Sequence, residues 1–199
     1  MTKRPRSNGA AGQIRIIGGQ WRGRKLPVPD SAGLRPTTDR IRETLFNWLA
    51  PDIQQARCLD CFAGSGALGL EALSRHAASA TLLELERPVA QQLEKNLQTL
   101  GATQGKVIQA NTLSWLAQAG EPYDVVFIDP PFRKGLLQET LTLLEQNGWL
   151  AADALIYVES EAEHGTLAVP THWHLHREKI AGQVACRLYR RQQEDAYVD

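Results

Sequence analysis

Short apolar runs alternate with longer segments of mixed polarity between residues 57 and 160. The runs have the length and Val/Ile/Leu content of buried strands, and the segments between them carry apolar residues at helical spacing. This alternation is typical of an α/β fold whose parallel sheet is covered by helices on both faces. It predicts strands near 57–62, 79–85, 106–109, 123–128 and 154–159, and helices near 66–75, 88–100, 112–119 and 135–146.

The two ends of the chain follow other patterns. Near the N-terminus, two β-prone runs flank Gly18-Gly19-Gln20, which predicts a hairpin, and apolar residues at helical spacing then predict a helix that ends at Pro51. Near the C-terminus, residues 173–179 and 184–189 predict an antiparallel hairpin at one edge of the sheet. The predicted parts are a basic arm (1–12), an N-terminal extension of hairpin and helix (13–51) and the α/β domain (52–199).

Composition narrows the class of protein. The chain has 199 residues, of which 43% are hydrophobic and 22% charged, enough for one globular domain with a small extension. No apolar run is long enough to cross a membrane, and the N-terminus has no apolar stretch of a secretory signal, so we expect a cytoplasmic protein. Three cysteines give no disulfide framework.

Charge is unevenly distributed although the net charge is zero. The first 50 residues contain ten Lys or Arg against three acidic residues. Such a basic region attracts a polyanion, and a solvated tail is the alternative interpretation. The candidate RNA-binding residues of the hairpin are Arg15, Arg22, Arg24 and Lys25.

A glycine-rich turn follows the first predicted strand of the α/β part. Gly64-x-Gly66-x-x-Gly69 has the spacing of a dinucleotide-binding loop, and Glu84 follows 20 residues after Gly64, where the next strand ends. The glycines allow close approach of the backbone to a ligand, and the acid can accept hydrogen bonds from ribose hydroxyls. These features predict an adenosine-containing cofactor; a tight turn without a ligand is the alternative.

The sequence Asp129-Pro130-Pro131-Phe132 follows the fourth predicted strand. Two prolines stiffen the backbone and leave their carbonyl groups free. The Asp129 carboxylate and the Pro130 carbonyl can accept hydrogens from an exocyclic amino group, and Phe132 can stack on the base that carries it. A strand end followed by a rigid turn is the alternative. Arg133 and Lys134 could hold phosphates or simply begin a helix.

Nicotinamide or flavin dinucleotides and S-adenosylmethionine share this loop geometry. Hydride transfer needs a group that polarises a carbonyl or alcohol, which the segment after the fourth strand does not supply. Acceptors for an amino group favour methyl transfer instead. Transfer to adenine N6 or to a protein glutamine would need the same acceptors, so these substrates stay open. Two alternatives to a methyltransferase are a dinucleotide-dependent oxidoreductase and a non-catalytic rRNA-binding assembly factor.

Three stretches of the chain resemble the RsmD family, class I S-adenosylmethionine-dependent methyltransferases that act on N2 of a guanine in 16S ribosomal RNA. They run from Ile14 to Leu26, from Leu34 to Asn47 and from Leu59 to Leu70. The resemblance implies a Rossmann-like sheet of seven mostly parallel strands, a monomer, and 16S rRNA in the small ribosomal subunit or its assembly intermediate as the substrate.

The resemblance also implies roles for single residues. Gly64 and Gly66 would lie under the methionine part of S-adenosylmethionine, with Asp60 nearby, and Glu84 would bind the ribose. Leu85 would pack on the adenine, and Asn111, where many relatives have Asp, would lie beside its amino group. Thr37 would cover the cofactor from the N-terminal side, or else only cap a helix. The cofactor-binding residues are therefore Asp60, Gly64, Gly66, Glu84, Leu85, Asn111 and Thr37.

Two further patterns favour structure over metal binding. Cys58 and Cys61 have no second pair and should point to opposite faces of the first strand, as core residues. His172, His174 and His176 alternate with Trp173 and Leu175, which predicts a solvated histidine face above a buried Trp/Leu face. Methyl transfer needs no metal, and we expect none.

Overall fold

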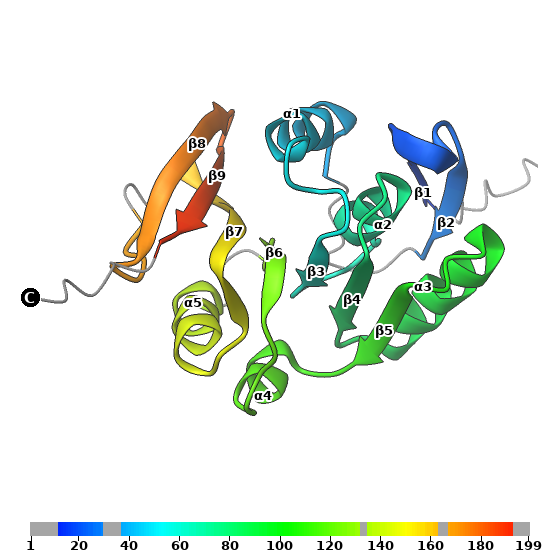
Figure 1. The fold of residues 1–199 in the computed structure, drawn as a ribbon. Coiled ribbons are helices and arrows are strands. Elements are labelled where there is room, and N and C mark those ends of the chain that lie inside the picture. The colour runs from blue at the N-terminus through cyan, green and yellow to red at the C-terminus, as the bar shows by residue number, and fades with distance from the viewer. Residues whose placement is uncertain (1–11, 30–36, 132–134, 163–166, 193–199) are drawn as a thin grey trace, which may run out of the picture.

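The protein contains one seven-stranded sheet with helices on both faces and a separate two-stranded sheet (Figure 1). The computed structural model describes residues 12–29, 37–131, 135–162 and 167–192. Its elements are β1 (Gly12–Arg15), a 3₁₀ turn (Gly19–Trp21), β2 (Lys25–Val28), α1 (Asp39–Leu49), β3 (Arg57–Asp60), α2 (Ala67–Ser74), β4 (Ser79–Glu84), α3 (Arg87–Leu100), β5 (Gly105–Gln109), α4 (Thr112–Leu116), β6 (Tyr123–Ile128), α5 (Leu137–Gln146), β7 (Leu150–Glu161), β8 (Trp173–Ala181) and β9 (Val184–Arg191).

The strand order in the large sheet is β5-β4-β3-β6-β7-β9-β8. The first five strands of this order are parallel to one another, whereas β9 is antiparallel to β7 and β8. The predicted α/β class, with a mostly parallel sheet and a C-terminal antiparallel hairpin, is therefore confirmed. The predicted strands and helices are all present, with ends that differ by up to four residues.

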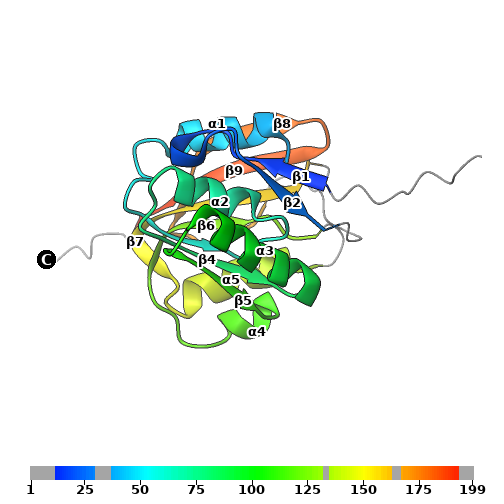
Figure 2. The same cartoon turned by 90° about the vertical axis from the view of Figure 1, so that its right-hand side faces the viewer.

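Each face of the sheet has its own hydrophobic core. On one face, α1, α2, α3 and the β1–β2 hairpin pack against residues such as Cys58, Val125 and Phe127. On the other face, α4 and α5 pack against residues such as Cys61, Val126 and Ile128. Figure 2 shows α1 with β1 and β2 on one side of the sheet and α4 on the other. Cys58 and Cys61 are thus buried free thiols on opposite faces, as predicted.

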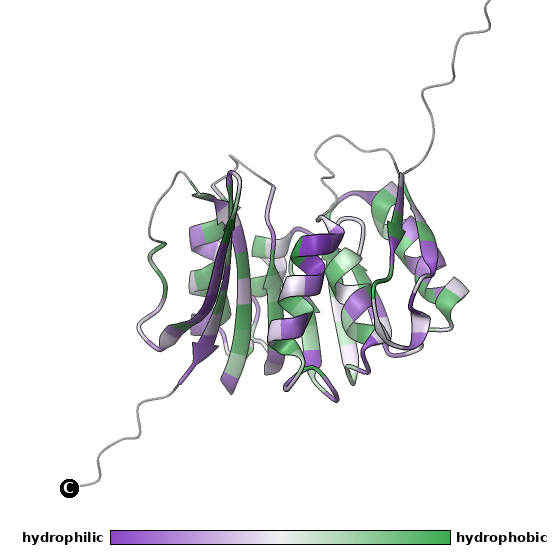
Figure 3. Cartoon of the chain, turned by 90° about the horizontal axis from the view of Figure 1, so that it is seen from above, coloured by the Kyte–Doolittle hydropathy of each residue, from purple (hydrophilic) through white to green (hydrophobic). Residues whose placement is uncertain are grey.

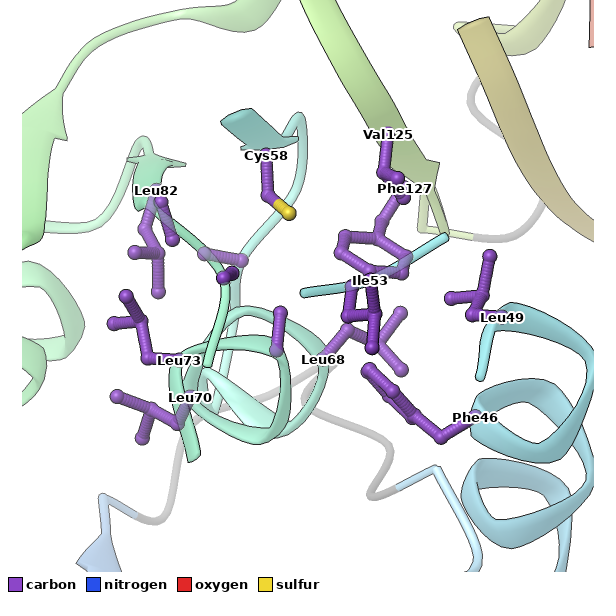
Figure 4. Packing of buried hydrophobic residues seen from close by; sticks show 14 of the residues in the cluster. Phe46, Leu49, Ile53, Cys58, Leu68, Leu70, Leu73, Leu82, Val125 and Phe127 are labelled. Atoms are coloured by element: carbon purple, nitrogen blue, oxygen red, sulfur yellow. The ribbon is translucent and has the colours of Figure 1, made fainter. Parts of the chain in front are cut away.

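Helix α1 ties the N-terminal extension to the sheet through aromatic packing. The ring centroids of Phe46 and Phe127 lie 5.9 Å apart, and the Arg75 guanidinium lies over the Phe46 ring at 5.1 Å. Figure 4 shows Phe46, Leu49 and Ile53 meeting Leu68 of α2 and Phe127 of β6 in one packed cluster. Because this cluster joins α1 to β6, it fixes the start of α1 relative to the end of β6.

The N-terminal hairpin is shorter than predicted. Residue Trp21 lies in the 3₁₀ turn rather than in a strand, and β1 ends at Arg15. The reason is tertiary: the Trp21 N–H donates to Ser74 Oγ at 3.1 Å, and the Gln20 side chain donates to the Leu73 carbonyl at 3.3 Å. Gly19 has φ +79°, and a Cβ there would lie 2.1 Å from the Ser74 carbonyl oxygen. The connection is shaped by α2, not by a two-residue turn.

The C-terminal edge strand also departs from the prediction. Trp173 is buried, but Leu175 is 53% exposed, and a bulge between Leu175 and Arg177 interrupts the alternation. His172 precedes the strand. The predicted buried Trp/Leu face is therefore wrong for Leu175, which lies beside the bulge in the exposed middle of β8, a strand that is mostly hydrophilic in Figure 3. Within the described residues, no cluster of His, Cys, Asp or Glu could hold a metal.

A buried glutamate of α2 holds the N-terminal hairpin in place. Glu71 is fully buried and accepts the backbone N–H groups of Ile17 and Gly18 at 2.8 and 3.2 Å. It also pairs with Arg42 at 3.8 Å and Arg75 at 3.3 Å. The two cations compensate the buried carboxylate, so the hairpin is attached as a rigid part of this face. Across the described segments, we find no helix both long and apolar enough to cross a membrane.

Candidate active site

The predicted site residues gather where the parallel strands end and the strand order reverses. From β3 the chain continues to β4 and β5 on one side, whereas β6 and β7 lie on the other side of β3. Loops that follow β3 and β6 therefore diverge at the carboxyl edge of the sheet, which is the usual ligand site of open α/β folds. The β3 loop carries the glycines, and the β6 loop carries Asp129.

The glycine loop and the acid of the next strand are joined directly. The Gly64 N–H donates to Glu84 Oε2 at 2.8 Å, and the Glu86 N–H donates to Glu84 Oε1 at 3.1 Å. Both carboxylate oxygens are thus fixed by backbone donors and still have lone pairs for ligand hydroxyls. This contact confirms the proximity predicted from the 20-residue spacing between Gly64 and Glu84.

Gly66 and Gly69 allow close packing of α2 on its neighbours, in addition to the close approach of the backbone to a ligand that the motif predicts. Gly66 begins α2 with φ +81°, and a Cβ there would lie 2.5 Å from Leu93 of α3. A Cβ on Gly69 would lie 2.9 Å from Leu82 of β4. The second and third glycines of the loop therefore let α2 lie close to α3 and the sheet, whereas the predicted role of Gly64 in ligand binding stays a prediction.

Asp60 lies buried at the end of β3 with half of its carboxylate satisfied. Its Oδ2 accepts the Gly69 N–H at 3.2 Å, whereas Oδ1 has no hydrogen-bond partner among the described residues. Burial raises the pKa of this carboxyl group to about 7, and the negative charge of Glu84 adds to the effect. A buried acceptor without a partner suits a ligand that brings a donor, above all a cationic one.

The residues predicted to flank an adenine are exposed. Leu85 is 58% exposed, and its predicted contact with adenine stays a prediction. The Asn111 side chain caps α4 by accepting the Ser114 N–H at 3.1 Å. Its Oδ1 therefore already has one donor. The hollow of about 400 Å³ between α3 and β5 is lined by Arg87, Ala90, Gln91, Glu94 and Gln109 and includes none of the predicted site residues.

Asp129 lies at the end of β6 under the start of the N-terminal helix. Thr37 Oγ1 donates to Asp129 Oδ2 at 3.5 Å, a long hydrogen bond. Thr37 thus contacts Asp129 rather than capping a helix, while the neighbouring Thr38 caps α1 by accepting the Ile41 N–H. Pro130 is buried and Pro131 exposed. Phe132, Arg133 and Lys134 lie outside the described residues, so their predicted roles stay predictions.

A second carboxylate, which the sequence analysis missed, lies against Asp129. Glu159 of β7 is buried, and the pairing of Ile128 with Val158 places it beside Asp129 at the ends of the two strands. Burial raises the pKa of Asp129 well above its usual range, and the negative charges of Glu159 and Asp60 raise it further. One signal could have revealed Glu159: like Glu84, it is an acid at the end of an apolar run, where a parallel strand reaches the ligand edge.

The basic residues of the hairpin do not all lie near this edge. Arg15 pairs with Asp39, the first residue of α1, at 3.6 Å, which places it near the start of α1 and thus near Thr37. Arg24 instead donates to the Thr99 carbonyl at 3.4 Å, in the last turn of α3. Since α3 begins beside Glu84, this contact lies about 18 Å along the helix from the ligand edge. Arg22 and Lys25 are exposed.

Comparison with known proteins gives consistent matches along nearly the whole chain. The family described as "Conserved hypothetical protein 95" matches residues 14–190. "Ribosomal RNA small subunit methyltransferase D" of Escherichia coli K12 is 70% identical over 190 residues, which cover 96% of each chain. The Haemophilus influenzae protein of the same name is 53% identical over 191 residues, covering 94% of this chain and 98% of that one.

Solved structures agree with these matches. A putative methyltransferase from Escherichia coli superposes with a TM-score of 0.87 at 70% identity, covering 91% of this chain and 99% of the other. A putative S-adenosylmethionine-dependent methyltransferase from Streptococcus mutans has a TM-score of 0.63 at 12% identity, covering 89% of this chain and 55% of that one. The latter likeness concerns the fold alone.

Proposed function

We propose a specific reaction for this chain, which belongs to the Conserved hypothetical protein 95 family, the family of RsmD. The chain transfers a methyl group from S-adenosylmethionine to the N2 amino group of a guanine in 16S rRNA. The proposal rests on one observation: the carboxylates expected to bind the cofactor and the carboxyl group expected to bind the amino group lie at the same edge of the sheet. Glu84 and Asp60 supply acceptors for a cationic adenosine cofactor, and Asp129 supplies an acceptor for an amino group.

The residues present fit S-adenosylmethionine. The unpartnered Oδ1 of Asp60 would accept hydrogens from its ammonium group, and the fixed carboxylate of Glu84 would accept the ribose hydroxyls. Gly64 would allow close approach of the methionine part, and Leu85 would cover the adenine. When bound, this cofactor supplies an electrophilic methyl group on a sulfonium. The chain's own task is then to hold and activate the acceptor.

Asp129 would activate the amino group as a hydrogen-bond acceptor. The nitrogen lone pair of a base amino group is delocalised into the ring, so the nitrogen is a poor nucleophile. Acceptors such as the Asp129 carboxyl group and the Pro130 carbonyl pull on its hydrogens and favour a more tetrahedral nitrogen. Phe132 would stack on the extruded base, and the resulting alignment can lower the barrier by several kcal/mol, about 7 to 11 at most.

The proposed substrate is 16S rRNA in the small ribosomal subunit or an assembly intermediate, bound by a cytoplasmic monomer. Support comes from the relatives named as small-subunit rRNA methyltransferases and from the exposed basic hairpin. Because Arg15 lies near the start of α1 and Arg24 near the far end of α3, RNA that contacts both would run along the outside of the hairpin. Adenine N6 and protein glutamine remain alternative acceptors.

Incubation with methyl-labelled S-adenosylmethionine and separate acceptors tests the proposed substrate class. The acceptors are naked 16S rRNA, small subunits that lack the modification, DNA and a ribosomal protein extract. We expect label in RNA, with small subunits or their intermediates preferred. Label only in DNA or protein would contradict the proposal. Titration with S-adenosylhomocysteine and with NAD provides the control for cofactor class, and only the former should bind.

A further inference from the structure

Glu159 of β7 is a buried carboxylate to which the proposed function gives no task. Tyr157 and Glu159 lie two residues apart and share one face of the strand. The Tyr157 hydroxyl donates to Glu159 Oε1 at 3.0 Å, and the Cys186 thiol of β9 donates to the same oxygen at 3.9 Å. Both donors use Oε1, so neither of them uses Oε2. The glutamate is thus held at one oxygen and can accept a further donor at the other.

The strand register brings Glu159 beside Asp129, the proposed acceptor for the amino group. Strands β6 and β7 are parallel neighbours, and Ile128 pairs with Val158, so positions 129 and 159 follow side by side where the strands end. In the strand order β3-β6-β7, Glu159 lies on the far side of Asp129 from the glycine loop that follows β3. Glu159 therefore lies away from the residues proposed to hold the cofactor.

Asp129 and Glu159 both face the N-terminal helix. Phe127 and Tyr157 belong to the core beneath α1, and the two acids lie two positions further along the same strands, on the same face. Thr37, two residues before α1, donates to Asp129 on this face. Two acceptors thus lie side by side below the start of α1.

A third carboxyl group indicates that this edge is suited to a ligand that brings N–H groups. Asp60 ends β3, the strand paired with β6, and it is 2% exposed. Its Oδ1 has no hydrogen-bond partner among the described residues. Buried acceptors are rarely left unpaired in native proteins, so this atom indicates a donor that the described protein groups do not supply.

Guanine presents a row of donors that matches two adjacent acceptors. Its Watson–Crick edge carries the N2 amino group and, on the adjacent ring atom, the N1 hydrogen, whereas adenine has an acceptor at N1 beside its amino group. When Asp129 accepts from the amino group, the neighbouring acceptor, Glu159, faces N1. A carboxylate there accepts the N1–H of guanine and repels the N1 lone pair of adenine. Discrimination is strong, because a base without this donor leaves a buried acceptor unpaired.

We propose that Glu159 is a specificity-determining residue for guanine, which accepts the N1–H of the extruded base while Asp129 accepts from its N2 amino group. The inference rests on the proposed function and deepens it, since it assigns to one residue the choice between guanine and adenine that the Asp129-Pro130 acceptors leave open. Tyr157 is then a positioning residue, because its hydroxyl holds Glu159 Oε1.

A base analogue tests the contact at N1. 2-Aminopurine keeps the amino group of guanine but has an acceptor at N1 and lacks O6. Once the modified position is mapped, 16S rRNA with guanine or 2-aminopurine there is prepared by splinted ligation and reconstituted into small subunits. The kcat/KM of the wild-type protein should favour guanine by about 10- to 100-fold, the effect of one hydrogen bond to a charged group. Equal kcat/KM values would overturn the inference.

Glu159→Gln separates the effect of N1 from that of O6, because the loss of O6 affects both proteins alike. The Gln amide can donate to an acceptor at N1. The variant should therefore lose activity on guanine, keep or gain it on 2-aminopurine, and show little preference between the two. Its affinity for S-adenosylhomocysteine, measured by calorimetry, should stay within a few-fold, which also shows that it is folded. A guanine preference equal to that of the wild-type protein would overturn the inference.

Two further variants complete the test. Glu145→Gln is the matched control at a partly buried glutamate of α5, paired with Arg191, and it should keep the wild-type preference for guanine. Should Glu159→Gln not fold, Tyr157→Phe replaces it. Loss of the hydroxyl that holds Glu159 should reduce the preference about 3- to 5-fold, the effect of one neutral hydrogen bond, and an unchanged preference would overturn the inference.

The same measurements distinguish this inference from the proposed function. If the wild-type protein methylates N2 of guanine but does not favour guanine over 2-aminopurine, the inference fails and the proposed function stands. If it methylates no guanine in small subunits or 16S rRNA, both fail.

Discussion

The two halves of the ligand edge satisfy their carboxylates in opposite ways. At the ends of β3 and β4, Glu84 accepts two backbone N–H groups, and Asp60 accepts one. At the ends of β6 and β7, Asp129 and Glu159 lie against each other and are held by side chains of distant segments. The carboxylates of the first half have backbone donors, whereas those of the second half have side-chain donors. Under the proposed function, the first half would bind the cofactor and the second would bind the amino group, so we expect the two tasks to be separated along the sheet edge.

Asp129→Ala should give the largest effect, because it removes the proposed acceptor from the second half alone. We expect methyl transfer to fall on the order of 1,000-fold, the range for removing one preorganised group at a reacting centre. Affinity for S-adenosylhomocysteine, measured by calorimetry, should stay within a few-fold. The control is Asp124→Ala at the opposite end of the same strand, where Asp124 pairs with Arg57. Full methyl transfer by Asp129→Ala would contradict the proposal that Asp129 is the acceptor for the amino group.

Glu84→Ala should do the opposite of Asp129→Ala: it should weaken cofactor binding and leave most of the methyl-transfer rate. It removes the ribose acceptor and releases the Gly64 N–H, so affinity for S-adenosylhomocysteine should fall about 10- to 100-fold, the loss of one or two good hydrogen bonds to a charged group. Methyl transfer at saturating cofactor should recover most of its rate. Glu86→Ala is the neighbouring control, since only its backbone N–H contacts Glu84. Equal affinities in both variants would contradict the cofactor role.

Neutralising the basic hairpin should have the smallest effect. It should weaken RNA binding without changing the carboxylates in either half of the ligand edge. Arg22, Arg24 and Lys25 changed together to Gln should weaken RNA binding about equally for all sequences. The slope of log K against log salt should decrease by about 2, since each phosphate that is no longer neutralised contributes about 0.7 to 0.9. Arg15→Gln, nearer the catalytic edge, should also lower kcat/KM. Lys106→Gln on β5 is the control. A salt dependence unchanged by the triple substitution would exclude these residues from the RNA surface.

The parts of the fold predicted correctly are those fixed by local pattern. The apolar runs of β3 to β7 predict the sheet, and the 20-residue spacing relates Glu84 to the glycine loop, because both belong to the single β–α–β unit from β3 to β4. Tertiary contacts explain the errors. The pattern predicts a strand at Trp21 because the docking of this residue on Ser74 is not visible in the sequence. It predicts a buried Leu175 because the sequence does not show that α5 contacts β8 at Trp173 while Leu175 stays exposed.

Glu159 escapes prediction for the same reason. Its role depends on the register between β6 and β7, and on Cys186 reaching it from β9, 27 residues later in the chain. The prolines after Asp129 mark this acid in the sequence, but they do not reveal its pairing or its contact with Thr37, 92 residues earlier. A sequence motif with a fixed spacing can identify groups within one β–α–β unit, as it does for Gly64 and Glu84. It does not reveal a pairing such as that of β6 with β7, which depends on strand register.

Identification of the methylated nucleoside shows directly whether this protein modifies N2 of a guanine. Small subunits lacking the modification are incubated with the protein and labelled S-adenosylmethionine, and their 16S rRNA is digested to nucleosides for mass spectrometry. The account predicts one N2-methylguanosine per subunit, absent with Asp129→Ala and present with Asp124→Ala. Label in N6-methyladenosine, in ribosomal protein, or in N2-methylguanosine formed equally by Asp129→Ala would contradict it.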